Sequence, residues 1–78
     1  MVWNKKKEMV KKMIIKMTGL YGLENTFAYY RKLGDCFDFV NSIKYASELT
    51  KEEVEKVFEH KEWYLKQFGA KELVVIDS

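Results

Sequence analysis

The stretch that decides the fold is LTKEEVEKVFEHKEWYLKQFGAK, residues 49–71. In it, Thr50 is followed three residues later by Glu53, which is the spacing of a capping box, where each side chain satisfies a backbone amide at the start of a helix. Gly69 supplies a residue that readily adopts the left-handed conformation that often closes a helix. The stretch therefore predicts one helix of about five turns between Thr50 and Gly69.

A helical wheel at about 100° per residue divides this helix into faces. The apolar face, expected to lie on a sheet, consists of Val54, Val57, Phe58, Tyr64, Leu65 and Phe68. A second arc is an acidic stripe made of Glu52, Glu55, Glu59 and Glu62. Trp63 lies about 180° from Val54, flanked by Lys56 and His60. The wheel thus predicts that Trp63 points away from the core.

Strand-forming residues dominate three segments outside the helix. TFAYYRKL (residues 26–33) and CFDFV (36–40) flank Gly34 and Asp35, a pair suited to a two-residue primed turn, so we expect a β-hairpin. After the helix, ELVVID (72–77) is a β-branched run of the kind found in a buried strand.

Two segments allow more than one interpretation. Residues 10–17 fit a helix by spacing, but MIIKM (13–17) before the glycine-bearing loop TGLYGLEN fits a first strand, which we favour. Residues 1–12 then form a basic arm or a short helix. Apolar side chains of one parity continue the second hairpin arm to Tyr45, so a long or bent strand is possible, with a looser turn over 42–47 as the alternative.

Together these elements predict a small two-layer α+β domain. An antiparallel β-meander of three or four strands is packed by one helix in the C-terminal half, and a last strand returns to the sheet. The length of 78 residues gives room for one core, so we expect a single domain over residues 1–78, with an arm (1–12) and an α+β body (13–78).

Charge is distributed unevenly along the chain. The formal net charge is +2, but residues 1–17 hold six lysines against one glutamate, which leaves the other 61 residues with a charge of −3. Such an arm can bind an acidic partner or the chain's own acidic stripe. Its most basic run is Lys5, Lys6 and Lys7.

The residues that carry reaction chemistry are few. Cys36 is the only cysteine and His60 the only histidine, so the sequence predicts neither a disulfide nor a structural zinc site, and a reducing, cytoplasmic setting fits best. We expect Cys36 to be a small buried apolar residue and His60 to be solvated. Gly19 and Gly22 lack the lysine and spacing of a phosphate-binding loop. The sequence predicts no catalytic residue, metal or cofactor, and therefore no enzyme.

The hydropathy of the chain predicts no membrane-spanning segment, and we expect no membrane partner. The longest apolar runs contain four residues, as in FAYY and LVVI, which is far too short for a membrane span or for the core of a signal peptide.

The element order over about residues 13–77, together with Ala46, Leu49, Thr50 and Glu53, resembles small proteins encoded by phages and mobile elements of Gram-positive bacteria. In these proteins a short β-meander precedes an alanine, a capped helix and a last strand. Most are accessory factors, and some bind and inhibit host enzymes, including CRISPR effectors. The resemblance implies a setting and supplies no functional residues.

Two explanations of Trp63 follow. The arm could cover it with Trp3, Met9 and Val10, since a folded chain usually hides its tryptophans. Alternatively Trp63 is an exposed anchor, with Lys56, His60 and Glu59 around it, of the composition found at binding hot spots. On the second basis we expect a non-enzymatic protein-binding module that inhibits or modulates a bacterial host or defence enzyme or a nucleoprotein complex, as anti-CRISPR proteins do.

Nucleic-acid binding is the alternative function. Residues 27–33 place Phe27, Tyr29 and Arg31 on one strand face, expected in the core, and Tyr30 with Lys32 on the other, expected to be uncovered. Aromatic residues interleaved with cations can stack single-stranded bases, and Lys5, Lys6 and Lys7 would add phosphate contacts. Homodimerisation through an uncovered face or edge strand is a third possibility.

Overall fold

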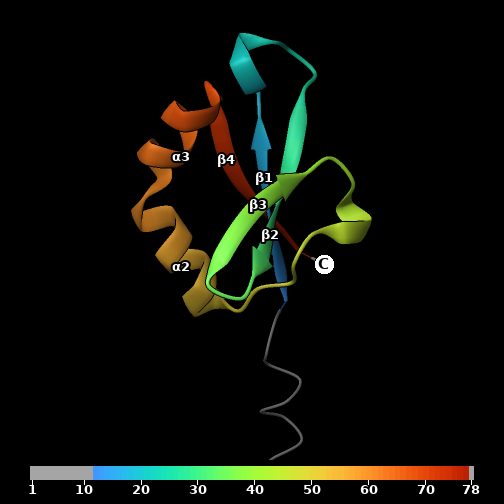
Figure 1. The fold of residues 1–78 in the computed structure, drawn as a ribbon, viewed down its shortest axis with the longest axis vertical. Helices are drawn as coiled ribbons and strands as arrows, with labels where there is room; N and C mark the ends of the chain where they lie inside the picture. The colour runs from blue at the N-terminus through green and yellow to red at the C-terminus, as the bar shows by residue number, and fades with distance from the viewer. Residues whose placement is uncertain (1–11, 78) are drawn as a thin grey trace, which may run out of the picture.

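Four antiparallel strands form one sheet in the order β3-β2-β1-β4 in a computed structural model, which describes residues 12–77 (Figure 1). The strands are β1 (Met13–Thr18), β2 (Phe27–Leu33), β3 (Cys36–Val40) and β4 (Glu72–Asp77). Helices α2 (Lys51–Glu59) and α3 (Lys61–Phe68) follow the meander, and short 3-10 helices η1 (Leu20–Gly22) and η2 (Ile43–Tyr45) lie in the connections. The predicted α+β architecture is confirmed.

The helical stretch begins and ends where its capping signals predict. The Thr50 hydroxyl accepts a hydrogen bond from the Glu53 amide at 3.3 Å. In return, a Glu53 carboxylate oxygen accepts a hydrogen bond from the Thr50 amide at 2.9 Å. Gly69 closes the stretch with φ 56°. The prediction of one continuous helix is wrong, however: His60 leaves the helical region (φ −113°, ψ 27°) and separates α2 from α3.

The strand predictions hold with two changes. β1 is a strand, and Gly34 takes the positive φ (59°) that a two-residue primed turn requires. β3 ends at Val40, so the looser-turn alternative after the hairpin is the correct one. β4 is an edge strand of which only Leu73 is buried, rather than a buried strand, because the sheet ends beside it.

The segment after η2 (residues 46–49) hydrogen-bonds to both β1 and β2 in the region where these two strands no longer pair with each other. β1 and β2 pair only from Lys16–Tyr29 to Thr18–Phe27. Beyond that point, Leu49 exchanges two backbone hydrogen bonds with Met13, at 2.9 and 2.7 Å. Further along β2, the Ser47 amide donates to the Tyr30 carbonyl at 3.1 Å. The segment therefore bridges the two strands and delivers the chain to the start of α2 (Figure 1).

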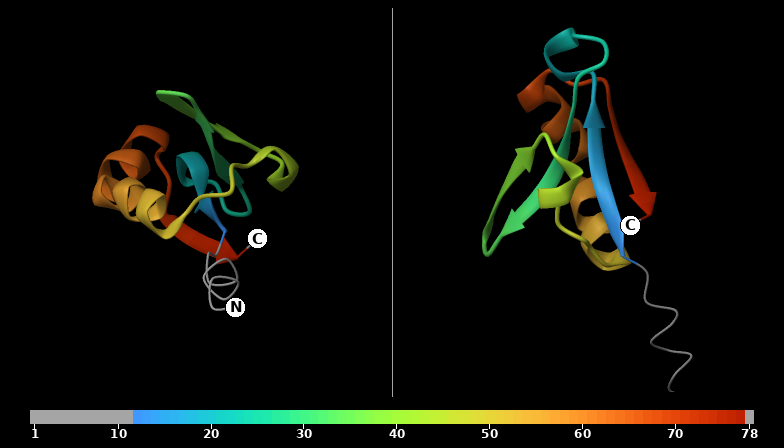
Figure 2. Two further views of the ribbon diagram at one scale, coloured as in Figure 1. Left: turned by 90° about the horizontal axis from the view of Figure 1, so that it is seen from below. Right: turned by 90° about the vertical axis from the view of Figure 1, so that its right-hand side faces the viewer.

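The core lies between the sheet and the two helices, which occupy the same side of the sheet in both views of Figure 2. It is built from Ile15, Met17, Tyr30, Leu49, Val54, Val57, Tyr64 and Leu73. Tyr30 is only 8% exposed and belongs to the core, so the prediction that its face is uncovered is wrong. On the other face Tyr29 is also buried, but Phe27, which was expected in the core, is 42% exposed. Both faces of β2 carry aromatic side chains, and the register decides between them: Tyr30 pairs with Phe39, whereas Arg31 pairs with Asp38 and needs solvent.

Candidate functional site

Trp63 is half exposed and at the same time held in place by other rings. Its side chain is 50% exposed at the start of α3. Its ring centroid lies 5.1 Å from that of Tyr64 and 6.2 Å from that of Phe37 on β3, both in edge-to-face geometry. Such pairs add about 0.5–1.5 kcal/mol beyond area burial, so the indole has a defined orientation before any partner arrives.

The position of Trp63 differs from the prediction of an uninterrupted wheel. The wheel places it opposite the apolar face, but its ring contacts Phe37, which packs against the core. The break at His60 ends the continuous 100° progression between α2 and α3, so angles carried across it no longer apply. Trp63 therefore lies at the rim of the core, beside β3, and does not point straight away from the sheet.

Polar residues around Trp63 are gathered only in part as predicted. A shallow hollow is lined by Phe58, Glu59, His60, Lys61, Glu62 and Trp63. Glu59 and His60 are exposed there, so the structure brings them together with Trp63. Lys56 is exposed on α2 and does not line this hollow. Phe37 could not be predicted as a neighbour of Trp63, because contacts between distant elements leave no local pattern in the sequence.

Cover by the N-terminal arm lies outside the described residues. This holds for Trp3, Met9 and Val10 and equally for Lys5, Lys6 and Lys7. The four glutamates of the acidic stripe are, however, described, and all four are exposed.

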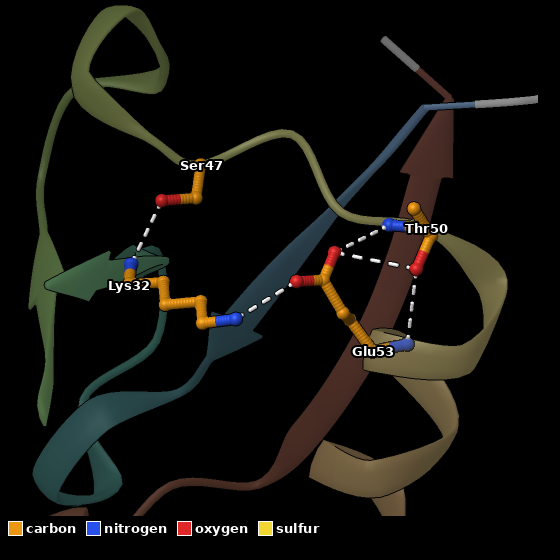
Figure 3. A network of polar contacts seen from close by, with 4 residues as sticks. All are labelled: Lys32, Ser47, Thr50 and Glu53. Carbon is orange, nitrogen blue, oxygen red and sulfur yellow. Dashed lines mark hydrogen bonds and ion pairs between the residues drawn. The ribbon is translucent and has the colours of Figure 1, made fainter. Parts of the chain in front are cut away.

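Lys32 and Tyr30, the predicted nucleic-acid residues, belong instead to the packed side of the sheet. The Lys32 ammonium donates to the Glu53 carboxylate at 2.9 Å, and its backbone amide donates to the Ser47 hydroxyl at 2.7 Å (Figure 3). Hydrogen bonds from the Thr50 backbone and from Lys32 lower the pKa of Glu53 to about 2. Burial raises the pKa of Tyr30. Tyr30 cannot stack a base from this position.

The cation–aromatic surface predicted for Tyr30 is present on the opposite face. There the Lys16 ammonium lies 4.8 Å from the ring centroid of Phe27, which is 42% exposed. Lys16, Phe27 and Lys71 line one hollow, and neither lysine forms an ion pair within the described residues. On the same face, Arg31 donates to both carboxylate oxygens of Asp38, at 2.9 and 2.6 Å.

The residues that could bind a metal or react covalently are placed as follows in the described part of the chain. Cys36 is exposed at the start of β3, so the prediction of a buried cysteine is wrong, because the hairpin turn leaves this edge residue uncovered. Residues 12–77 contain no cluster of three or more His, Cys, Asp or Glu side chains that could hold a metal ion. Among the helices in this range, none has the length and apolar character needed to cross a membrane.

Comparison of the chain with protein-family models, curated proteins and solved structures found no match. The resemblance to phage and mobile-element proteins therefore stays a prediction.

Proposed function

We propose that this chain is a non-enzymatic protein-binding module whose docking surface is the Trp63 patch, defined as Trp63, Phe37, Glu59 and His60. The observation that carries the proposal is the half-exposed indole braced by Phe37 and Tyr64. Binding hot spots are enriched in tryptophan, where truncation costs about 2 kcal/mol or more. A side chain that is already ordered loses less conformational entropy on binding than a free one.

The surroundings of Trp63 suit a protein partner. Glu59 and His60 supply a polar rim beside the indole, and Phe37 extends the apolar contact onto the sheet. An apolar centre with a polar rim is the usual anatomy of a protein–protein interface.

The finer proposal concerns the partner. We propose a bacterial host or defence enzyme, or a nucleoprotein complex, which this chain inhibits or modulates in the cytoplasm as a product of a phage or mobile element. This part rests on the resemblance in element order.

The test is capture from bacterial lysate with three immobilised proteins: the unmodified chain, Trp63→Ala and Tyr45→Ala. Tyr45 is a matched control, because it is an exposed aromatic side chain (58%) from η2, outside the Trp63 patch. The proposal expects a protein that the unmodified chain and Tyr45→Ala retain and that Trp63→Ala loses. Equal capture by all three proteins would place the docking surface elsewhere.

Nucleic-acid binding is a second candidate, favoured by one specific observation. Two lysines without ion pairs in the described residues, Lys16 and Lys71, share a hollow with the exposed ring of Phe27. Ammonium groups beside an aromatic ring can bind phosphate and stack a base. Glu24 lines the same hollow and weakens its attraction for phosphate, so we propose weak binding at most.

A further inference from the structure

The two edge strands of the sheet differ in their protection. β4 begins with Glu72 and ends with Asp77, which places a charge at each end of its edge. β3 contains neither lysine nor proline, and its single charged residue, Asp38, is held in an ion pair by Arg31 of β2. Charges, prolines and bulges are the devices that keep edge strands from pairing with other chains. β3 is therefore the open edge of this sheet.

The backbone of β3 presents unpaired groups along this edge. A two-residue hairpin turn is closed by a hydrogen-bonded pair, here Leu33 and Cys36, and such pairs then recur at every second residue. The amides of the intervening residues, Phe37 and Phe39, consequently face away from β2. Within residues 12–77, no backbone hydrogen bond reaches this outer side of β3.

The open edge is continuous with the Trp63 patch. Phe37 belongs to both, since its backbone lies on the edge and its ring contacts Trp63. Residues directly opposite each other on paired strands project their side chains to the same face, about 4.5–5.5 Å apart. A residue that paired with Phe37 from outside would thus place its side chain on the helix side, next to the indole.

We propose that the β3 edge accepts an extended segment of the protein partner as a fifth strand, with one apolar side chain of that segment seated against Phe37 and Trp63. This inference rests on the proposed function and specifies what the Trp63 patch recognises. A helix would not satisfy the edge, because its own backbone groups are bonded internally. An extended chain satisfies the free amides and fills the side-chain site together.

A second copy of this chain fits the edge less well. Antiparallel pairing of two β3 strands over all five residues places Asp38 directly opposite the Asp38 of the other copy. Like charges in this position destabilise a strand pair. This repulsion favours a strand from a different protein as the occupant.

The experiment uses selection from a display library of random peptides of about ten residues, long enough to span an edge strand, against the full chain. Selected peptides are then measured on two variants. Trp63→Ala removes the side-chain site. N-methylation of the Phe39 amide blocks the backbone edge and keeps every side chain; the full chain can be made by chemical ligation at Cys36, its single cysteine.

The proposal expects selected peptides with apolar residues at alternate positions that bind both variants at least about tenfold more weakly, the effect of losing one well-formed contact. The thermal melt of the N-methylated chain should be unchanged, because its outward amide has no partner in the fold.

Other outcomes overturn the inference and separate it from the proposed function. If only Trp63→Ala weakens the binding of the selected peptides, the proposed function stays intact and strand addition is excluded. Selected peptides whose binding neither variant weakens, or a selection that yields no binder, contradict strand addition at β3, and the lysate capture then decides the proposed function separately. Self-association that N-methylation abolishes, seen by light scattering, would assign the edge to a second copy instead.

Discussion

The Lys32 ammonium lies 2.9 Å from the Glu53 carboxylate and links β2 to the first turn of α2. The same carboxylate closes the capping box with Thr50, so one side chain starts the helix and ties it to the sheet (Figure 3). Because of this double role of Glu53, the Lys32 side chain is held in an ion pair, although the sequence predicts that it lies on an uncovered face.

Acid should weaken the fold through Glu53. Its pKa is about 2 in the folded chain against an ordinary value of 4.5, so it binds protons less readily when folded. The contribution of Glu53 to the folding stability is therefore complete above about pH 4.5, and it is lost as the pH falls toward 2. Chemical unfolding of Glu53→Gln, which keeps a capping-box residue without the charge, should show a shallower loss of stability across this range.

Glu55→Gln is the matched control, because Glu55 is exposed in the same helix and makes no ion pair in the described residues. Its acid profile should follow that of the unmodified chain. Some acid loss will remain in every protein, because hydrogen bonds from Arg31 lower the pKa of Asp38 as well. Identical profiles for Glu53→Gln and the unmodified chain would contradict the proposed role of Glu53.

Gly69 should tolerate substitution less well than Gly34. Both have positive φ, 56° and 59°, which costs an alanine about 1–2 kcal/mol. A Cβ at Gly69 would also lie 3.3 Å from the Tyr21 Cα, whereas one at Gly34 meets nothing within 4 Å. The free energy of unfolding should therefore fall further for Gly69→Ala than for Gly34→Ala. Equal losses would mean that the loop containing Tyr21 moves aside.

Local signals in the sequence predicted most of the elements. The capping box at Thr50, the glycine at position 69 and the Gly34 turn act over three or four residues, and each is found in place. The break at His60 has no such signal, since neither glycine nor proline occurs there. The break could therefore not be predicted from this segment.

The faces of β2 could not be assigned from the strand alone. Alternation separates Tyr30 from Phe27 correctly, but both sides carry aromatic residues, and only pairing with β3 shows which side is covered. The candidate site was predicted in part for the same reason. Trp63 was identified from the helix, whereas its contact with Phe37 spans 26 positions of sequence and depends on the fold.

Nucleic-acid binding, if present, should depend on the face that carries Lys16 and Phe27. A fluorescent single-stranded oligonucleotide should bind weakly at low salt, and binding should fall steeply as salt rises, because bound cations are released. Lys16→Ala and Phe27→Ala should each reduce the affinity for the oligonucleotide, and Lys32→Ala should have little effect on that affinity. Tight binding that resists these two changes would exclude the outer face as the site.

Two neighbouring aromatic residues of α3 should differ in their effect on stability. Tyr64 is buried and lies in the core, so Tyr64→Ala should cost about 3–5 kcal/mol. Trp63→Ala removes only a half-buried side chain and two ring contacts, so it should lower the free energy of unfolding by about 1–2 kcal/mol. Denaturant melts measure both. A Trp63→Ala protein as unstable as Tyr64→Ala would show that Trp63 is mainly a core residue.

The most direct measurement of the central claim is the affinity of the captured partner for the unmodified chain, for Trp63→Ala and for Tyr45→Ala, with each protein first shown to be folded. Loss of a hot-spot tryptophan corresponds to about 2 kcal/mol or more, which is roughly thirtyfold in Kd. We predict that Trp63→Ala binds at least this much more weakly and that Tyr45→Ala binds as the unmodified chain does. A partner that binds Trp63→Ala as tightly as the unmodified chain would contradict the account.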